Sequence, residues 1–147
     1  MLAQIMLQGL PETVSLTLVA IVLTGTRLPA VKFLFLVLFM LALVGILRSL
    51  PLTFGFHLLV GIAGLGLGLA FLTRTPIART MLSSASAYLI LLTFEVSIHL
   101  VLTNVLGIKV DDIIDKNWLW IIMGWPQIIA MFFTAYLLRK KDITIKI

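Results

Sequence analysis

Residues 31–50 read VKFLFLVLFMLALVGILRSL, an apolar run with one lysine near its start and one arginine near its end. A helix of about 20 such residues is long enough to cross the hydrocarbon core of a bilayer. Backbone amides cannot stay unpaired in hydrocarbon, so the run is expected to be helical. Further apolar runs lie on both sides of it, at about residues 2–23, 52–73, 77–106 and 118–138. The sequence therefore predicts an all-α integral membrane bundle of about five transmembrane helices, with residues 1–147 as a single domain.

The composition argues against a soluble protein, against a nucleic-acid partner and against sites that depend on cysteine. Hydrophobic residues make up 61% of the chain and charged residues 12%, which leaves little room for a domain outside the bilayer. The net charge of +5 does not predict a nucleic-acid partner, because the basic residues lie at the ends of the apolar runs. We therefore predict that the chain lies in the lipid bilayer of a cell membrane and crosses it several times. Cysteine is absent, which removes disulfides, thiolate metal sites and cysteine nucleophiles.

The first apolar run contains a proline near its middle. Its first basic neighbour, Arg27, follows the run, so the run lacks the basic start of a signal peptide and is expected to be retained. Pro11 is favoured at the first position of a helix but costs about 3 kcal/mol in a helix interior. We therefore predict that residues 1–10 form a separate short helix or interfacial segment, and that the membrane helix begins at Pro11. One kinked span from Leu2 to Leu23 is the alternative.

Basic residues predict the orientation of the bundle. With five spans, eight of the eleven lysines and arginines fall on the side of the carboxyl terminus, and three fall on the other. Because positive residues favour the cytoplasmic side, the amino terminus is expected outside and the carboxyl terminus inside. The loop before the last run is then an outer one. It carries Asp111, Asp112 and Asp115, and Trp118 and Trp120 follow it at the expected depth of an aromatic belt. The eight are Arg27, Lys32, Arg74, Arg79, Arg139, Lys140, Lys141 and Lys146, and the three are Arg48, Lys109 and Lys116.

Small residues in the third and fourth runs predict one close helix crossing. Gly61, Gly64 and Gly68 lie in the third run, and the last two form a small-xxx-small pair. Ser83 and Ala87 lie opposite them in the fourth run, which is expected to pack antiparallel to the third. Small residues let two helix backbones approach closely in lipid. We therefore expect these five residues to form the contact between the two helices.

Charged and titratable residues inside the runs predict a buried polar cluster. Glu95 lies near the middle of the fourth run, and His99 follows one helical turn later on the same face. A charge at the bilayer centre costs about 2.5–3.5 kcal/mol, so such groups face the interior of a bundle and find partners there. The predicted partners, all in the outer half of the bundle, are Glu12, Arg48 and His57.

Two interpretations of this cluster remain open. It is either a polar network that fixes helix register or a ligand- or proton-sensing site open to the outer face. A metal site is not predicted, because only Glu95 and His99 have helix-face spacing. The sequence contains no His-Glu-x-x-His and no Gly-x-Ser-x-Gly motif, so no catalytic residue, no cofactor and no enzyme activity is predicted.

Two stretches and Glu95 carry a resemblance to a known group of proteins. The stretches are LQGLPE at residues 7–12 and ILRSLPLTFGFH at residues 46–57. With them the chain resembles small clostridial-type membrane proteins, which are similar to the membrane sensor region of accessory-gene-regulator-type and sporulation-type sensor histidine kinases. The resemblance implies a module of a bacterial inner membrane. Because the chain continues only briefly beyond residues 139–142, a kinase domain with a phosphoacceptor helix and an ATP site is not expected.

Two functions follow from these observations. In the first, a sensor-like or accessory protein relays or presents a signal through a partner, which is another membrane protein or a second copy of the chain. In the second, a small transporter or transporter subunit moves a proton or a small solute. Transport needs polar groups that reach both faces, yet the inner half of the fourth run offers only serines and Tyr88. This pattern favours the sensor-like protein.

Overall fold

The computed structural model describes residues 2–109, 111 and 116–147, and in this part of the chain every regular element is a helix. Asp112 and Asp115, predicted in the outer loop, lie outside the described residues. Five helical segments are long and apolar enough to cross a membrane, which confirms the predicted architecture. The elements are α1 (Leu2–Gln4), η1 (Ile5–Gly9), α2 (Leu10–Thr24), α3 (Ala30–Ser49), α4 (Phe54–Thr73), α5 (Ile77–Val105) and α7 (Asn117–Lys140).

The first span is continuous through Pro11, so the predicted break is wrong, although the regular α-helix does begin beside Pro11, at Leu10. η1 is a π-helix that leads directly into α2, and the Leu10 N–H donates to the Ile5 carbonyl across the wider π turn. A proline ring clashes with the carbonyl four residues earlier in a regular α-helix. The π turn widens the helix just before the proline, which relieves that conflict and keeps the segment Ile5–Thr24 helical.

Glycine and proline mark the turns between the helices. α2 ends at Gly25, whose φ of 71° is left-handed and whose N–H donates to the carbonyls of Ile21 and Val22. Prolines then precede the next helices: Pro29 stands before α3, and Pro76 stands before α5. A proline lacks an N–H and therefore loses nothing at the start of a helix.

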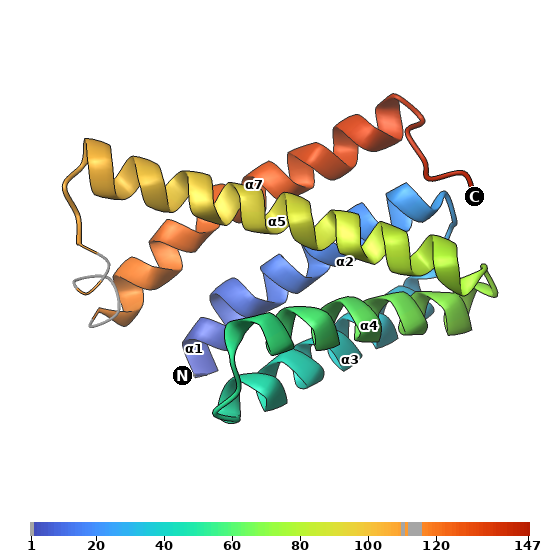
Figure 1. Ribbon diagram of the computed structural model, residues 1–147, viewed down its shortest axis with the longest axis horizontal. Coiled ribbons are helices and arrows are strands. Elements are labelled where there is room, and N and C mark those ends of the chain that lie inside the picture. The colour runs from blue at the N-terminus through green and yellow to red at the C-terminus, as the bar shows by residue number, and fades with distance from the viewer. Residues whose placement is uncertain (1, 110, 112–115) are drawn as a thin grey trace.

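α2 is the central helix of the bundle. It contacts α3, α5 and α7, while α4 packs between α3 and α5 (Figure 1). Nine of the fifteen residues of α2 are buried, including the apolar Leu16, Val19 and Ala20. Its buried threonines Thr13 and Thr17 donate their hydroxyls to carbonyls one turn earlier in the same helix. α2 thus buries polar residues without needing a partner on another helix.

α5 and the pair of α3 and α4 separate towards one end of the bundle (Figure 1). The end with Gln4, the α3–α4 turn and the last turns of α5 is named the amino end, and the opposite end is named the carboxyl end. Figure 1 shows α5 diverging from α3 and α4 towards the amino end, whereas α7 crosses α5 and diverges from α3 and α4 towards the carboxyl end. At the carboxyl end the tail turns back on α2, and the Ile145 N–H donates to the Leu23 carbonyl at 2.7 Å.

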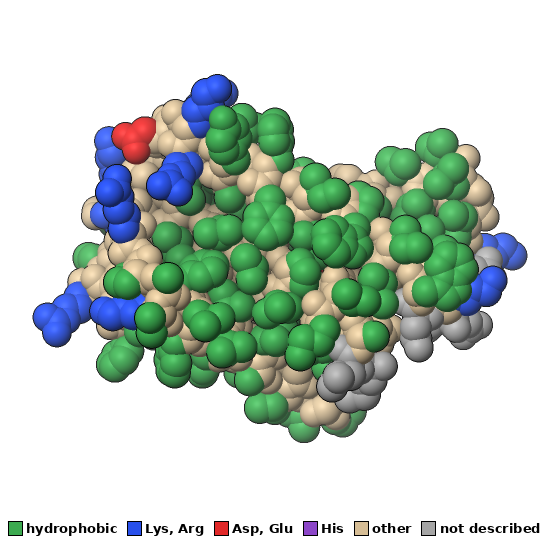
Figure 2. All heavy atoms as spheres, turned by 180° about the vertical axis from the view of Figure 1, so that it is seen from behind, with side chains coloured by type: hydrophobic (Ala, Val, Ile, Leu, Met, Phe, Trp, Pro, Cys, Tyr) green, Lys and Arg blue, Asp and Glu red, His purple; other side chains and the backbone are tan. Residues whose placement is uncertain are grey.

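The outer surface is apolar between two charged ends. Figure 2 shows hydrophobic side chains over most of one face, with lysine and arginine side chains gathered at its ends. Large side chains such as Phe71, which is 84% exposed, and Val31 point away from the core. An apolar belt of this kind is what a helical bundle presents to lipid.

Two glycines of α4 face α5. A Cβ atom at Gly61 would overlap the hydroxyl of Tyr88, and one at Gly66 would lie 3.1 Å from the Cα atom of Met81. α4 and α5 are therefore in close contact along this face, in agreement with the predicted crossing at Gly61.

Gly64 and Gly68 face α3, which corrects the prediction that they meet α5. A Cβ atom would lie 2.5 Å from Cδ2 of Leu43 at Gly64, and 2.7 Å from Cδ1 of Leu36 at Gly68. Their spacing places the pair on a common face, but α4 lies between two helices and has two buried faces. The spacing alone does not say which neighbour that face meets.

Candidate functional site

A cavity of about 700 Å³ opens where the helices splay at the amino end. It is bounded by the amino-terminal segment and α2, by the second half of α3, by the start of α4 and by the middle of α5. Its volume lies within the roughly 300–1,000 Å³ that small-molecule sites occupy. The polar or charged side chains among its lining residues are Gln4, Glu12, Thr13, Arg48, Ser49, His57, Tyr88 and Glu95.

Three charged side chains from three helices face this cavity. Glu12 comes from the first turn of α2, Arg48 from the last turn of α3 and Glu95 from the middle of α5. Glu12 lies close enough to Arg48 and Glu95 for both charges to act on it. In the described part of the chain the three groups form no direct ion pair. The three side chains therefore line a common space and do not pair with one another across it.

A second, smaller cavity of about 60 Å³ lies on the side of α7. Glu12, Arg48 and Glu95 line it as well, so the two cavities meet at these three side chains. By volume the smaller cavity has room for one or two water molecules. Its other lining residues are Gln8, Ile98, His99, Leu102, Trp120, Met123, Gly124 and Gln127.

Gln8 connects the amino-terminal segment to α7 in the wall of the smaller cavity. A Cβ atom at Gly124 would overlap the Gln8 amide, so the glycine makes room for this side chain. The Gln8 Oε1 atom is buried and, among the described residues, has no hydrogen-bond donor. A buried amide oxygen without a donor is costly and is usually satisfied by water or a ligand. Gln127, also buried, lines the same space from α7.

The two histidines lie in different cavities and turn toward backbone. The His57 Nε2 atom lies 2.7 Å from the Leu47 carbonyl oxygen, and its Nδ1 atom lies 2.9 Å from the Thr53 carbonyl oxygen. These two contacts tie the end of α3 to the start of α4. In the smaller cavity, the His99 Nδ1 atom lies 2.8 Å from the Glu95 carbonyl oxygen.

The larger cavity has an apolar floor. Leu16, Met40, Tyr88 and Leu91 line it and are buried in the core. Below them the helices pack tightly towards the carboxyl end, and Tyr88 fills the space over Gly61. Buried residues in this closed half of the bundle include Leu36, Leu65, Leu69, Thr80, Ser83, Ser84 and Ala87.

The structure places the five residues of the predicted cluster around the two cavities, but not as one compact group. Glu12, Arg48 and Glu95 line both, whereas His57 lines only the larger cavity and His99 only the smaller one. Arg48 is exposed and not buried, because it stands in the last turn of α3 where its long side chain reaches the edge of the bundle.

Sequence reasoning missed the glutamines of the site. Gln8 and Gln127 each interrupt an apolar run, which was the available signal, but neither is charged and no periodicity joins them. Among the described residues, no three histidine, aspartate or glutamate side chains lie close enough to hold a metal ion. The arrangement offers a space with hydrogen-bond acceptors, one guanidinium and apolar walls.

No protein-family model, curated protein or solved structure matches the chain. The resemblance to the membrane region of sensor kinases therefore stays a prediction that rests on residues 7–12, residues 46–57 and Glu95.

Proposed function

We propose that the protein is a sensor-like or accessory membrane protein that binds a small ligand in the larger cavity and passes the state of that cavity to a partner. The observation that carries this proposal is the one-sided shape of the site. The cavity opens among the splayed helices of the amino end, and packed side chains such as Leu65 and Leu69 fill the bundle beyond its floor. A transport path needs access from both ends, whereas a receptor needs it from one.

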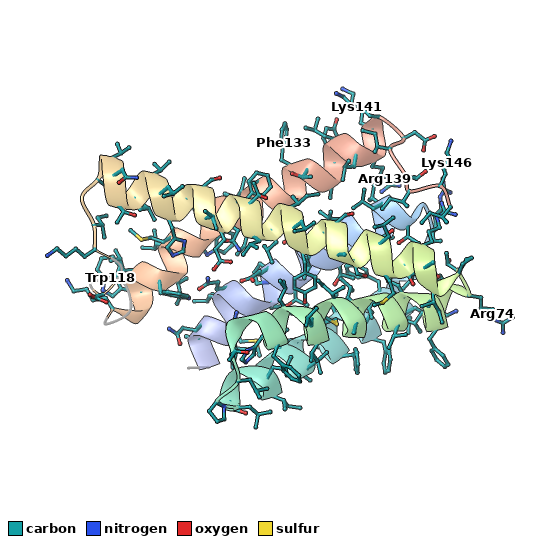
Figure 3. All side chains as sticks on the ribbon, viewed as in Figure 1. Arg74, Trp118, Phe133, Arg139, Lys141 and Lys146 are labelled. Carbon is teal, nitrogen blue, oxygen red and sulfur yellow. The ribbon has the colours of Figure 1, made fainter. Side chains whose placement is uncertain are left out.

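The charge distribution supports an outward-facing cavity. Arg74, Arg139, Lys141 and Lys146 lie at the carboxyl end, and Trp118 lies at the opposite end (Figure 3). Under the positive-inside rule the carboxyl end is cytoplasmic and the cavity faces outside. Phe133 projects from α7 between the two ends, at the depth expected for lipid (Figure 3).

α2 supplies a physical link between the cavity and the carboxyl end. Glu12 and Leu16 line the cavity from its first turns, and Leu23 in its last turn accepts a hydrogen bond from Ile145 of the tail. A ligand that changes the position of α2 changes the place where the tail is held. A partner that binds the tail or the basic residues beside it then binds with a different affinity.

Cysteine labelling tests the one-sided access, since the chain has no cysteine of its own. Gly45 lines the cavity, and nothing lies within 4 Å of a Cβ atom placed there, so Gly45→Cys is expected to fold. Ser83→Cys is the matched control in the closed half, because serine and cysteine differ by one atom and Ser83 is buried. An impermeant thiol reagent is applied to right-side-out and to inverted membrane vesicles.

The proposal expects Gly45→Cys to react in right-side-out vesicles only and Ser83→Cys to react in neither. Labelling of Gly45→Cys from both sides would show alternating access. The proposal of a sensor-like protein would then be wrong, and a small transporter would be the better explanation. Labelling of Ser83→Cys would show that the bundle is open through its closed half.

A further inference from the structure

The walls of the two cavities carry more negative than positive charge. Glu12 and Glu95 contribute two carboxylates, and Arg48 contributes one guanidinium. Arg48 acts on Glu12, but the described residues form no direct ion pair that neutralises either carboxylate. Inside a membrane protein such a charge is costly unless a partner compensates it. Among the described residues, the arrangement leaves one carboxylate without a cation to balance it, and a partner from outside the chain fits that place.

Several acceptor oxygens line the region where the cavities meet. The buried Gln8 Oε1 atom is an acceptor without a donor, and the carboxylates of Glu12 and Glu95 add further acceptor oxygens. His57 adds no free donor to this space, because both of its ring nitrogens are directed at backbone carbonyl oxygens of the α3–α4 turn. Two carboxylates beside one guanidinium favour a ligand that brings positive charge.

The other wall residues favour a ligand in which the charged group is attached to an apolar organic group. The floor of the larger cavity is made of Leu16, Met40, Leu91 and the ring of Tyr88, and its volume of about 700 Å³ far exceeds that of a bare ion. Inorganic cations require several oxygen ligands around one point, and among the described residues no three acidic or histidine side chains converge in this way. An apolar group gains free energy by leaving water for these walls.

We propose that the ligand is an amphipathic organic cation, with an ammonium group held between Glu12 and Glu95 and an apolar body against the floor. This inference rests on the proposed function, since it names the ligand class of the same cavity. The aromatic ring of Tyr88 adds a favourable surface for a cation that has shed its water. Arg48, at the rim, opposes the same ligand by charge repulsion and limits its affinity.

Three ligands with a common benzyl body test the charge selection on the unaltered protein. They are benzyltrimethylammonium, its uncharged isostere neopentylbenzene, and phenylmethanesulfonate as the anion. Each is titrated calorimetrically into lipid nanodiscs that contain the protein, and empty nanodiscs correct for partition into lipid. Saturable binding of the ammonium, at least about tenfold tighter than that of the other two, is expected from charge-assisted contacts.

Absence of saturable ammonium binding, or equal binding of neopentylbenzene or of the sulfonate, overturns the cation assignment. Such a result leaves the one-sided cavity intact, because the labelling of Gly45→Cys decides that point separately. If Gly45→Cys is labelled from both sides while the ammonium still binds, the proposed ligand class is supported and the proposed sensor-like function is contradicted.

Variants identify the carboxylates that hold the ammonium. Glu12→Gln and Glu95→Gln are each expected to weaken its binding by about tenfold, and Arg48→Gln is expected to tighten it. Asp142→Asn is the matched control, because Asp142 is an exposed carboxylate at the carboxyl end, outside both cavities. Unchanged affinity in folded Glu12→Gln and Glu95→Gln proteins refutes the assignment. If either variant fails to fold, the ligand series on the unaltered protein still decides.

Discussion

Gly66→Ala is expected to destabilise the bundle by forcing α4 and α5 apart. The new Cβ atom would lie 3.1 Å from the Cα atom of Met81, whereas two carbon atoms prefer about 3.5–4.0 Å. The backbone of α5 cannot rotate away as a side chain can, so the helices separate by about half an ångström and lose contacts along their shared face. Overpacking of this kind costs about 1–3 kcal/mol. Alanine recovers about 0.5–1 kcal/mol as the better helix former, which leaves a net loss of about 0–2.5 kcal/mol.

Gly45→Ala is the matched control for this measurement. Gly45 is also inside a helix, but nothing lies within 4 Å of a Cβ atom at this position. Only the gain in helix propensity of about 0.5–1 kcal/mol remains, so this variant is expected to be slightly more stable than the wild type. Unfolding by sodium dodecyl sulfate in mixed micelles, followed by far-ultraviolet circular dichroism, measures both free energies. Equal stability of the two variants would refute the close contact between α4 and α5 at Gly66.

Three further outcomes follow from the structure and the proposals. In intact cells, an impermeant thiol reagent is expected to label Lys109→Cys and not Lys141→Cys, and the reverse pattern would overturn the orientation. In a double-mutant cycle, Glu12→Gln and Arg48→Gln are expected to be non-additive in unfolding free energy by about 0.5–3 kcal/mol, whereas strict additivity would show that the two charges do not interact. His57→Ala is expected to cost about 0.5–1.5 kcal/mol because it removes the two ring contacts that tie the end of α3 to the start of α4, and hydrogen exchange at that turn that matches the wild type would contradict this role.

The sequence was sufficient to predict the number of spans and most of their limits. Apolar runs are bounded by residues such as Pro29, Pro51 and Pro76, and the helices begin or end within a few residues of them. These features are local, since a run of apolar residues must become a helix in hydrocarbon whatever its neighbours are. Only Pro11 was misread, because a proline inside a helix depends on the hydrogen-bond pattern of the turn before it. The π turn at Ile5–Gly9 has no signature in the residues themselves.

The candidate site was predictable only in part. Glu12, Arg48 and Glu95 were recognisable because charged residues are rare in apolar runs, and the structure brings them to the same cavities. Which helix faces which neighbour depends on the packing of all five spans. For this reason the partner of Gly64 and the approach of Gln8 to α7 were not deducible from spacing.

The burial of α2 has a consequence for the order in which the protein is made. α2 is synthesised before α5 and α7, so the helix that ends deepest in the bundle enters the membrane with those neighbours still missing. Its threonine hydroxyls are already bonded to carbonyls of the same helix, as at Thr13 and Thr24, and lipid therefore meets few open polar groups. Glu12 is the exception. Arg48, whose charge acts on Glu12, is synthesised with the very next span. We therefore expect α2 and α3 to insert as a pair.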